Sequence, residues 1–224
     1  MNMLKYDGII FDLDGTLLDT LEDLSNSVNE ALGMYGYKRY AKEDYKLKIG
    51  GGFRDLLERS LPTDTPAEMI DRILSSFLAV YDKNYRKNTK PYNGIGQTLI
   101  KLRDAGMSLA VNSNKRDDYT KILLSDKLSM ISFIAIYGER TNIPKKPDPA
   151  AAEIIIKTMN IPKSKIIYVG DSKTDILTAK NAGIESIGVT WGFRDRKELE
   201  KYGAVYIADR PEDILNIVGT DIIN

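Results

Sequence analysis

The sequence predicts an α/β protein with a doubly wound, mainly parallel sheet and an all-helical segment inserted early in the chain. Three observations predict this fold. Short apolar runs alternate with helical patterns over most of the chain, as in sheets with helical crossovers. Gly106 and Gly183 stand where helices are expected to end, and Pro211 stands where one is expected to begin. Residues 18–90 break the alternation and offer helical patterns without a convincing buried strand.

The expected strands are short apolar runs, which are typical of a parallel sheet buried on both faces. They are Tyr6–Phe11, Met107–Asn112, Phe133–Tyr137, Ile166–Val169, Ile184–Val189 and Ala204–Ile207. Helices are expected at Ile95–Ala105, Asp117–Lys127, Ala150–Met159, Lys173–Ala182, Lys197–Tyr202 and Pro211–Val218. Together these elements predict one α/β core domain formed by residues 1–17 and 91–224.

The inserted segment, residues 18–90, is expected to be a smaller helical domain. Its helical patterns lie at Leu21–Tyr35, Lys42–Lys48, Phe53–Leu61 and Ala67–Tyr85. A length of 224 residues fits a core domain with a smaller insertion, because domains usually contain roughly 100–150 residues. Gly and Pro near Asp14–Asp19 and Asn88–Gly94 are expected to form hinges between the two parts.

The composition restricts the chemistry. The chain contains no cysteine and no histidine, which excludes thiolate nucleophiles, Ser-His-Asp triads and zinc sites built on Cys or His. The 32 basic and 32 acidic residues cancel, and no dense basic block suggests a nucleic-acid partner. No apolar run approaches the ~20 residues that cross a bilayer. We therefore expect a cytoplasmic protein that binds neither nucleic acid nor membrane and uses carboxylates, hydroxyls, lysine and a hard metal ion.

Asp12 and Asp14 follow the first expected strand and precede Gly15. Residues i and i+2 of an extended segment point to the same side, so both carboxylates are expected above the carboxyl edge of the sheet. Two close negative charges need a partner, and Mg2+ would allow one carboxylate to act as nucleophile and the other as acid and base. An ordinary turn with solvated Asp residues is the alternative.

Asp171 and Asp175 repeat this arrangement late in the chain. Asp171 ends an expected strand after Gly170, and Asp175 lies one helical turn later on the same face. Capping of the following helix by Asp171 and Ser172 is the alternative. Capping alone does not explain why two distant strands both end in acidic loops beside glycine.

Two further loops follow expected strands. Ser113-Asn114-Lys115 places a hydroxyl and an amide before a helix, which suits a phosphate, although capping is the commoner use of these residues. Lys145-Lys146-Pro147-Asp148-Pro149 places cations before another helix, although surface lysines are mostly solvated. Both loops could reach the same sheet edge as the acidic pairs.

In this order, the four segments match the four motifs of the haloacid dehalogenase superfamily, and the match spans nearly the whole chain. They are Asp12-Leu13-Asp14-Gly15-Thr16, Ser113-Asn114-Lys115, Lys146-Pro147-Asp148-Pro149 and Gly170-Asp171-Ser172-x-x-Asp175. The insertion after the first motif resembles the helical C1 cap of that superfamily. Within it, the chain resembles the phosphoglycolate phosphatases most, on Asp12–Leu32, Pro91-Tyr92-Asn93-Gly94 and Gly188-Val189-Thr190-Trp191-Gly192-Phe193.

The resemblance implies a Mg2+-dependent phosphatase. Asp12 resembles the nucleophile that forms an aspartyl-phosphate, and Asp14 resembles the acid that protonates the leaving group and then activates water. Asp12, the Asp14 carbonyl and Asp171 would hold the metal, with Asp175 bracing them. The residues expected to bind phosphate or substrate are Gly15, Thr16, Ser113, Asn114 and Lys146.

The motif details favour phosphate ester hydrolysis over related reactions. Asp14 speaks against dehalogenases and phosphonatases of the superfamily, which lack an acid there, and the absence of histidine speaks against its hexose-phosphate mutases. The adjacent Lys145 leaves the identity of the catalytic lysine open, and Lys146 is favoured because it directly precedes Pro147.

The substrate is expected to be a small phosphorylated metabolite, with phosphoglycolate the leading candidate. Gly51 in a glycine-rich loop and Arg54 after it could contact a carboxylate, although a flexible turn with a surface arginine explains them equally well. Inorganic pyrophosphate, sugar phosphates and nucleotides are alternative substrates, and a non-catalytic phosphate-binding regulator is a remote alternative. Mg2+ or Mn2+, and a monomer or a homodimer, remain open.

Overall fold

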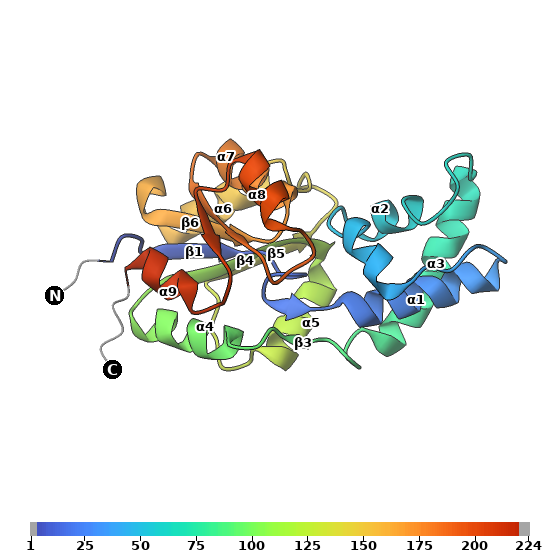
Figure 1. Cartoon of the computed structure of the whole chain (residues 1–224), viewed down its shortest axis with the longest axis horizontal. Helices are drawn as coiled ribbons and strands as arrows, with labels where there is room; N and C mark the ends of the chain where they lie inside the picture. Colours follow the sequence, from blue (N-terminus) through green and yellow to red (C-terminus); the bar gives the residue numbers. More distant parts are fainter. Residues whose placement is uncertain (1–3, 220–224) are drawn as a thin grey trace.

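The computed structural model describes residues 4–219 and has a six-stranded parallel sheet at its centre (Figure 1). The strand order is β5-β4-β1-β6-β7-β8, with every neighbouring pair parallel. The strands are β1 (Gly8–Phe11), β4 (Ser108–Arg116), β5 (Ala135–Glu139), β6 (Ile166–Gly170), β7 (Glu185–Val189) and β8 (Tyr206–Ala208). The predicted doubly wound α/β fold is confirmed.

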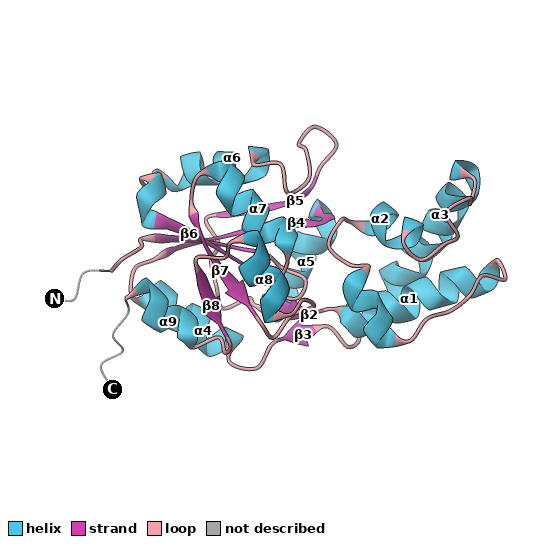
Figure 2. Cartoon of the chain, turned by 45° about the horizontal axis from the view of Figure 1, so that its top comes forward, coloured by secondary structure: helices cyan, strands magenta, loops and turns pink. Residues whose placement is uncertain are grey.

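Helices cover both faces of the sheet (Figure 2). On one face lie α6 (Ala150–Met159) and α7 (Lys173–Ala182), with α8 (Arg196–Tyr202) beside α7. On the other face lie α4 (Ile95–Asp104), α5 (Asp117–Lys127) and α9 (Asp213–Val218). Successive residues of β1 alternate between these layers, because Ile10 packs with α6 and α7 while Ile9 and Phe11 pack with the opposite helices. The sheet is therefore buried on both sides, as its continuous apolar runs predict.

A helical segment, referred to below as the cap, lies in the chain between two short strands. β2 (Leu18–Asp19) and β3 (Lys90–Pro91) pair antiparallel and flank the cap helices α1 (Leu21–Met34), η1 (Lys42–Leu47), α2 (Phe53–Glu58) and α3 (Ala67–Asn84). Figure 1 shows these helices at the end of the sheet opposite the two termini. The pairing of β2 with β3 was not predicted, because two residues are too short to give a strand pattern.

A buried carboxylate joins the two chain segments at the base of the cap. Asp23 in the first turn of α1 is 1% exposed. Its oxygens accept hydrogen bonds from the backbone N–H groups of Asn88 and Thr89 and from both of their side chains, at 2.8–3.0 Å. Five hydrogen bonds from four donor groups compensate the loss of hydration of one buried charge. The start of α1 and the segment before β3 are thus held together.

Two elements differ most from their predicted form, while α2, α9 and β8 are shorter than predicted by two or three residues at one end. β4 continues four residues beyond the expected end at Asn112, with a register shift between Asn112 and Arg116, because the Ser113–Arg116 segment still runs beside β5. The expected helix at Lys42–Lys48 is a 3₁₀ helix, η1. Among the described residues, no helix combines the length and apolarity needed to span a membrane.

Candidate active site

Three acidic side chains meet at the carboxyl edge of the sheet. Asp12 follows β1 and Asp171 follows β6, and these two strands are neighbours, so their ends lie side by side. Asp175 comes from the first turn of α7, which starts just after Asp171. One carboxylate oxygen from each of the three lies within 4.8 Å of the others, and all three residues are buried.

The carboxylate oxygens of these three residues differ in the number of hydrogen bonds that they accept. Oδ2 of Asp175 accepts hydrogen bonds from the N–H (3.1 Å) and hydroxyl (2.7 Å) of Ser172, and its Oδ1 accepts one from Lys146. Oδ2 of Asp171 accepts the N–H of Phe193 at 2.6 Å. Within the described residues, Oδ2 of Asp12 and Oδ1 of Asp171 accept no hydrogen bond. Asp175 is therefore placed to brace the loop, and the other two carboxylates keep a free oxygen each.

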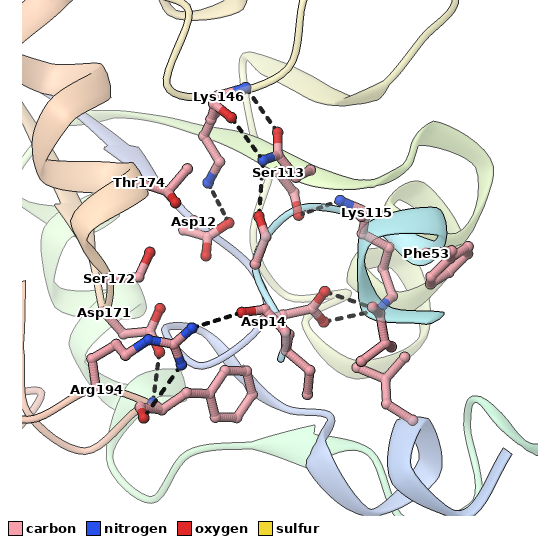
Figure 3. A pocket seen from close by; sticks show the side chains of 17 residues that line it. Asp12, Asp14, Phe53, Ser113, Lys115, Lys146, Asp171, Ser172, Thr174 and Arg194 are labelled. Carbon is pink, nitrogen blue, oxygen red and sulfur yellow. Dashed lines mark hydrogen bonds and ion pairs between the residues drawn. The ribbon is translucent and has the colours of Figure 1, made fainter. Parts of the chain in front are cut away.

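Lys146 is the lysine that reaches the acidic group (Figure 3). Its ammonium Nζ lies 2.7 Å from Oδ1 of Asp12 and 2.7 Å from Oδ1 of Asp175, with the side chain 3% exposed. Lys145 points elsewhere, to Glu139 at 2.9 Å and to the carbonyl oxygen of Gly51 at 3.3 Å. The structure thus places Lys146, and not its neighbour, beside the predicted nucleophile.

Burial and crowding shift the pKa values of this group. Burial raises the pKa of Asp12 to about 7, because it outweighs the opposing charge of Lys146, and the charge of Asp175 adds to it. Burial, with the charges of Asp175 and Asp12, also holds the pKa of Asp171 well above its usual range. Burial disfavours the Lys146 ammonium, but the two carboxylates beside it outweigh that cost and raise its pKa. The single ammonium of Lys146 therefore does not neutralise the negative charge that the three carboxylates carry when all are ionised.

Asp14 faces the same pocket from the loop after β1 and pairs with a different lysine. Nζ of Lys115 lies 2.9 Å from each of the two Asp14 carboxylate oxygens. Asp12 and Asp14 thus point to one pocket, as predicted from their spacing, but each has its own ammonium group. Figure 3 shows the two pairs on separate sides of the pocket.

Ser113 and Asn114, near the end of β4, have different roles at the pocket. Ser113 is 4% exposed and lines the pocket, with Oγ accepting the N–H of Lys115 at 3.1 Å. The Asn114 amide is used within the protein: Nδ2 donates to the carbonyls of Gly50 (2.9 Å) and Lys146 (3.1 Å), and Oδ1 accepts the N–H of Lys146 (2.9 Å). Asn114 therefore fixes Lys146 and the cap, and both N–H bonds of its side-chain amide are used within the protein.

Gly15 and Thr16 lie next to the pocket rather than in its lining. A Cβ on Gly15, whose φ is +87°, would lie 2.2 Å from Oδ2 of Asp171, so the glycine leaves room for that carboxylate. Thr16 is fully buried, and its carbonyl accepts the indole N–H of Trp191 at 3.0 Å. Neither residue is part of the pocket lining, although both were expected to bind phosphate.

The glycine-rich loop of the cap lies on the core through its backbone. Three successive carbonyls, those of Ile49, Gly50 and Gly51, accept hydrogen bonds from core side chains at 2.9–3.3 Å. Gly50 and Gly52 line the pocket, whereas Gly51 does not. Gly52 has a φ of +90°, and its Cβ would meet the Asn114 carbonyl at 3.1 Å, so this close approach requires glycine.

Arg54 does not reach the pocket. Its guanidinium, 42% exposed, pairs with Asp71 of α3 and with Glu58 one turn further along α2. The predicted contact between Arg54 and a substrate carboxylate therefore does not follow from this arrangement. The next residue toward the N-terminus, Phe53, lines the pocket instead, because successive residues of a helix point in different directions.

The pocket lies between the cap and the sheet edge, and both parts of the chain line it. From the core come Asp12, Asp14, Ser113, Asn114, Lys115, Lys146, Asp171, Ser172, Thr174, Phe193 and Arg194; from the cap come Leu24, Ile49, Gly50, Gly52, Phe53 and Leu56. Charged groups thus form the floor and apolar cap residues form much of the roof.

This geometry agrees with comparisons to known proteins. The family model of haloacid dehalogenase-like hydrolases matches residues 9–189. The chain belongs to this family. The curated phosphoglycolate phosphatase of Agrobacterium fabrum is 36% identical over 89% of this chain and 87% of its own length. That of Aquifex aeolicus is 31% identical over 96% of this chain and 98% of its own length.

Solved structures are also similar to this chain over nearly its whole length. The crystal structure of a predicted phosphoglycolate phosphatase from Lactobacillus delbrueckii subsp. bulgaricus has a TM-score of 0.91 and 32% identity, covering 96% of this chain and all of that chain. One from Haemophilus somnus has a TM-score of 0.89 and 27% identity, covering 96% and 99%. The predictions of the superfamily, of a likeness to phosphoglycolate phosphatases and of a phosphoric monoester hydrolase are confirmed.

Two charged pocket residues of this hydrolase, Lys115 and Arg194, were absent from the predicted site. Lys115 was part of a quoted motif, but no pattern indicated that it would pair with Asp14. Arg194 lies in the loop after β7 and donates hydrogen bonds to the cap carbonyls of Lys46, Leu47 and Ile49, the last at 2.9 Å. Its side chain is only 9% exposed. Arg194 also pairs with Glu198 at 3.5 Å, but no local signal shows that an arginine will reach backbone carbonyls almost 150 residues earlier in the chain.

Proposed function

We propose that this hydrolase is a Mg2+-dependent phosphatase that cleaves a small phosphomonoester through an aspartyl-phosphate on Asp12, with phosphoglycolate as the best candidate substrate. One observation carries the proposal. The buried Asp12 carboxylate lies at the sheet edge, held at one oxygen by Lys146, with a second carboxylate, Asp14, facing the same pocket. Binding of phosphate alone would need neither carboxylate, so this pair disfavours a non-catalytic regulator.

The residues present fit a divalent cation of the Mg2+ type. Asp12, Asp171 and Asp175 offer only hard oxygen ligands. Burial and the neighbouring carboxylates raise the pKa of Asp12 and of Asp171, and the single positive charge of Lys146 does not offset this effect. The free oxygens of Asp12 and Asp171, with the backbone carbonyl of Asp14, would hold the ion, and Asp175 would brace this loop. Bound Mg2+ would supply positive charge against the phosphoryl oxygens.

The proposed reaction has two steps. Asp12 attacks phosphorus as the ester P–O bond breaks, and Asp14 gives its proton to the leaving oxygen. A water molecule then attacks phosphorus, gives a proton to Asp14, and releases inorganic phosphate and Asp12. Lys146 beside Asp12 would offset charge on the nucleophile and phosphoryl group, and Ser113 would donate to a phosphoryl oxygen. The reaction needs alignment and positive charge and no imidazole.

We propose that residues 18–90 act as the cap that restricts the substrate to a small molecule. The pocket roof consists of cap residues, and the glycine-rich loop rests on the core through its carbonyls. Phosphoglycolate is supported by the names of the curated relatives, and the pocket cations Lys115, Lys146 and Arg194 suit a substrate with several negative charges. The same charges would suit inorganic pyrophosphate. A cytoplasmic location and a monomer or homodimer remain predictions.

A substrate screen tests the proposal. The purified protein with Mg2+ is assayed on phosphoglycolate, pyrophosphate, a hexose phosphate and a nucleoside monophosphate. We expect kcat/KM for phosphoglycolate to exceed the others by about tenfold or more, which corresponds to about 1.4 kcal/mol of transition-state discrimination. A preference for pyrophosphate would favour the alternative substrate, and inactivity on every phosphoester would overturn the proposal.

Asp12→Asn tests the mechanism. It removes the nucleophile and a metal ligand together, so we expect kcat to fall by at least about 10³-fold with the fold retained. Asp104→Asn, on the exposed surface of α4, is the matched control and should keep full activity. Appreciable turnover by Asp12→Asn would contradict the assignment of the nucleophile.

A further inference from the structure

Lys115 is a fully enclosed cation whose charged group has one carboxylate partner. Its side chain is 0% exposed, and Nζ lies 2.9 Å from both oxygens of Asp14. Asp14 itself is 13% exposed and faces the pocket. Two contacts from one ammonium to both oxygens restrict the rotation of the carboxyl group.

Two aromatic rings of the cap also lie close to the Lys115 ammonium. Nζ lies 5.5 Å from the ring centre of Phe53 in α2 and 5.3 Å from that of Tyr81 in α3. Figure 3 shows Phe53 beside the end of Lys115. Ring faces attract cations at such distances, and more strongly where water is excluded. The core therefore supplies the salt bridge of Lys115, and the cap supplies two aromatic rings beside the same ammonium.

We propose that Lys115 is a positioning residue that holds Asp14 for proton transfer, and that the cap completes this arrangement through Phe53 and Tyr81. The inference rests on the proposed function, because it assumes that Asp14 is the acid and base. When Asp14 gives its proton to the leaving oxygen, it becomes a carboxylate, and the adjacent ammonium stabilises the new negative charge. The same contact keeps that carboxylate aimed at the pocket to accept a proton from water in the second step.

This role has a consequence that depends on the leaving group. An alkoxide leaves with difficulty unless it is protonated as the P–O bond breaks, whereas p-nitrophenolate is stable enough to leave without that proton. Loss of Asp14 positioning should therefore slow alkyl phosphate hydrolysis much more than p-nitrophenyl phosphate hydrolysis. Damage to the metal site, to phosphate binding or to the fold would slow both.

The experiment measures kcat/KM for glycerol 2-phosphate and p-nitrophenyl phosphate in Lys115→Met. Neither ester carries a carboxylate, so a lost contact to a substrate carboxylate would not change the ratio. Met keeps the length and apolar stem of Lys without the charge. We expect the value for glycerol 2-phosphate to fall by about tenfold or more and that for p-nitrophenyl phosphate by less than about threefold. Lys115→Arg, which keeps the charge, should move the ratio back toward wild type.

A control and three outcomes decide the inference. Lys121→Met, an exposed lysine on α5, should leave both values unchanged. Equal losses on the two esters in Lys115→Met, or no loss on either, overturn the positioning role. If wild type hydrolyses no phosphoester, phosphoglycolate included, the proposed function falls and this inference with it, so the two failures are distinguishable.

A cap variant tests the second half of the inference. Phe53→Leu keeps an apolar side chain and removes the ring face over Lys115. We expect the same change of ratio, smaller than in Lys115→Met. A normal ratio in Phe53→Leu alongside a changed ratio in Lys115→Met would overturn the contribution of Phe53 and leave that of Lys115.

Discussion

The ammonium of Lys146 lies 2.7 Å from Oδ1 of Asp12, at a point where two segments 134 residues apart meet. The same ammonium lies 2.7 Å from Oδ1 of Asp175, so a single cation links the predicted nucleophile to the first turn of α7. Its neighbour, Lys145, pairs instead with Glu139 at the end of β5 and donates to the cap carbonyl of Gly51. The distinction matters because a buried ammonium beside the nucleophile can offset charge in the transition state, and an exposed one cannot do so as well.

Exchange of each lysine for methionine should therefore give different results. We expect Lys146→Met to lower kcat on p-nitrophenyl phosphate by about 10²-fold or more, because it removes a charge that touches the nucleophile. Lys145→Met should retain kcat within about threefold, because its ion pair with Glu139 is partly exposed. Steady-state kinetics on the two variants decide the point, and similar kcat values in both would contradict the placement of Lys146.

Removal of Arg194 should loosen the cap. The guanidinium donates to three cap carbonyls, so Arg194→Ala is expected to speed amide hydrogen exchange in residues 46–52 and to raise KM by about threefold or more. Arg196→Ala is the matched control, because Arg196 pairs with Glu200 and Asp209 at the surface. Unchanged exchange in residues 46–52 of Arg194→Ala would show that these hydrogen bonds do not hold the cap.

Arg54→Ala should have little effect on substrate binding. The side chain pairs with Glu58 and Asp71 outside the pocket, so we expect KM for phosphoglycolate to stay within about twofold of wild type and stability within about 1 kcal/mol. The measurement is KM on phosphoglycolate beside KM on p-nitrophenyl phosphate. A selective rise for phosphoglycolate would restore Arg54 to the substrate site.

The base of the cap depends on one buried carboxylate. Asp23→Ala leaves four polar groups of Asn88 and Thr89 without their acceptor, so we expect a loss of about 3 kcal/mol or more in the free energy of unfolding. Urea denaturation measures this. Glu22→Ala, whose carboxylate is half exposed, should cost less than about 1 kcal/mol. Equal losses in the two variants would be inconsistent with a role for the buried network.

Mg2+ should stabilise the protein more at high pH. Burial raises the pKa of Asp12 to about 7, so folding favours its protonated form, and this contribution is lost as the pH rises through that value. Mg2+ must displace this proton to bind the carboxylate. We expect saturating Mg2+ to raise Tm by about 3 °C or more at pH of about 8 and by less at about 6. Asp171→Asn should remove most of the increase, and an equal increase in that variant would exclude Asp171 as a ligand.

Much of the fold and the acidic part of the site could be predicted because their signals are local. Buried parallel strands give continuous apolar runs, and Asp12, Asp14 and Asp171 follow such runs directly. The ends of parallel strands meet at one edge, so residues far apart in sequence could be placed together. The pairing of β2 with β3 and the 3₁₀ form of η1 lacked such signals, because both elements are short.

Contacts between the cap and the core were not predictable in this way. Arg54 and Arg194 are both arginines in loops or short helices, and nothing in their neighbouring residues distinguishes the one that enters the pocket. The choice depends on where the cap rests on the sheet edge. That position results from the packing of distant segments and from backbone carbonyls that every residue type carries.

The sequence by itself determined the class of fold, the family and the chemical means: carboxylates, a hydroxyl and lysines, with no thiol or imidazole. Only the tertiary structure decided how the charges pair, with Lys146 on Asp12 and Lys115 on Asp14 under two aromatic rings of the cap. The physical reason is that periodicity and turn residues specify local structure, whereas a salt bridge depends on the distance between side chains that the fold alone brings together.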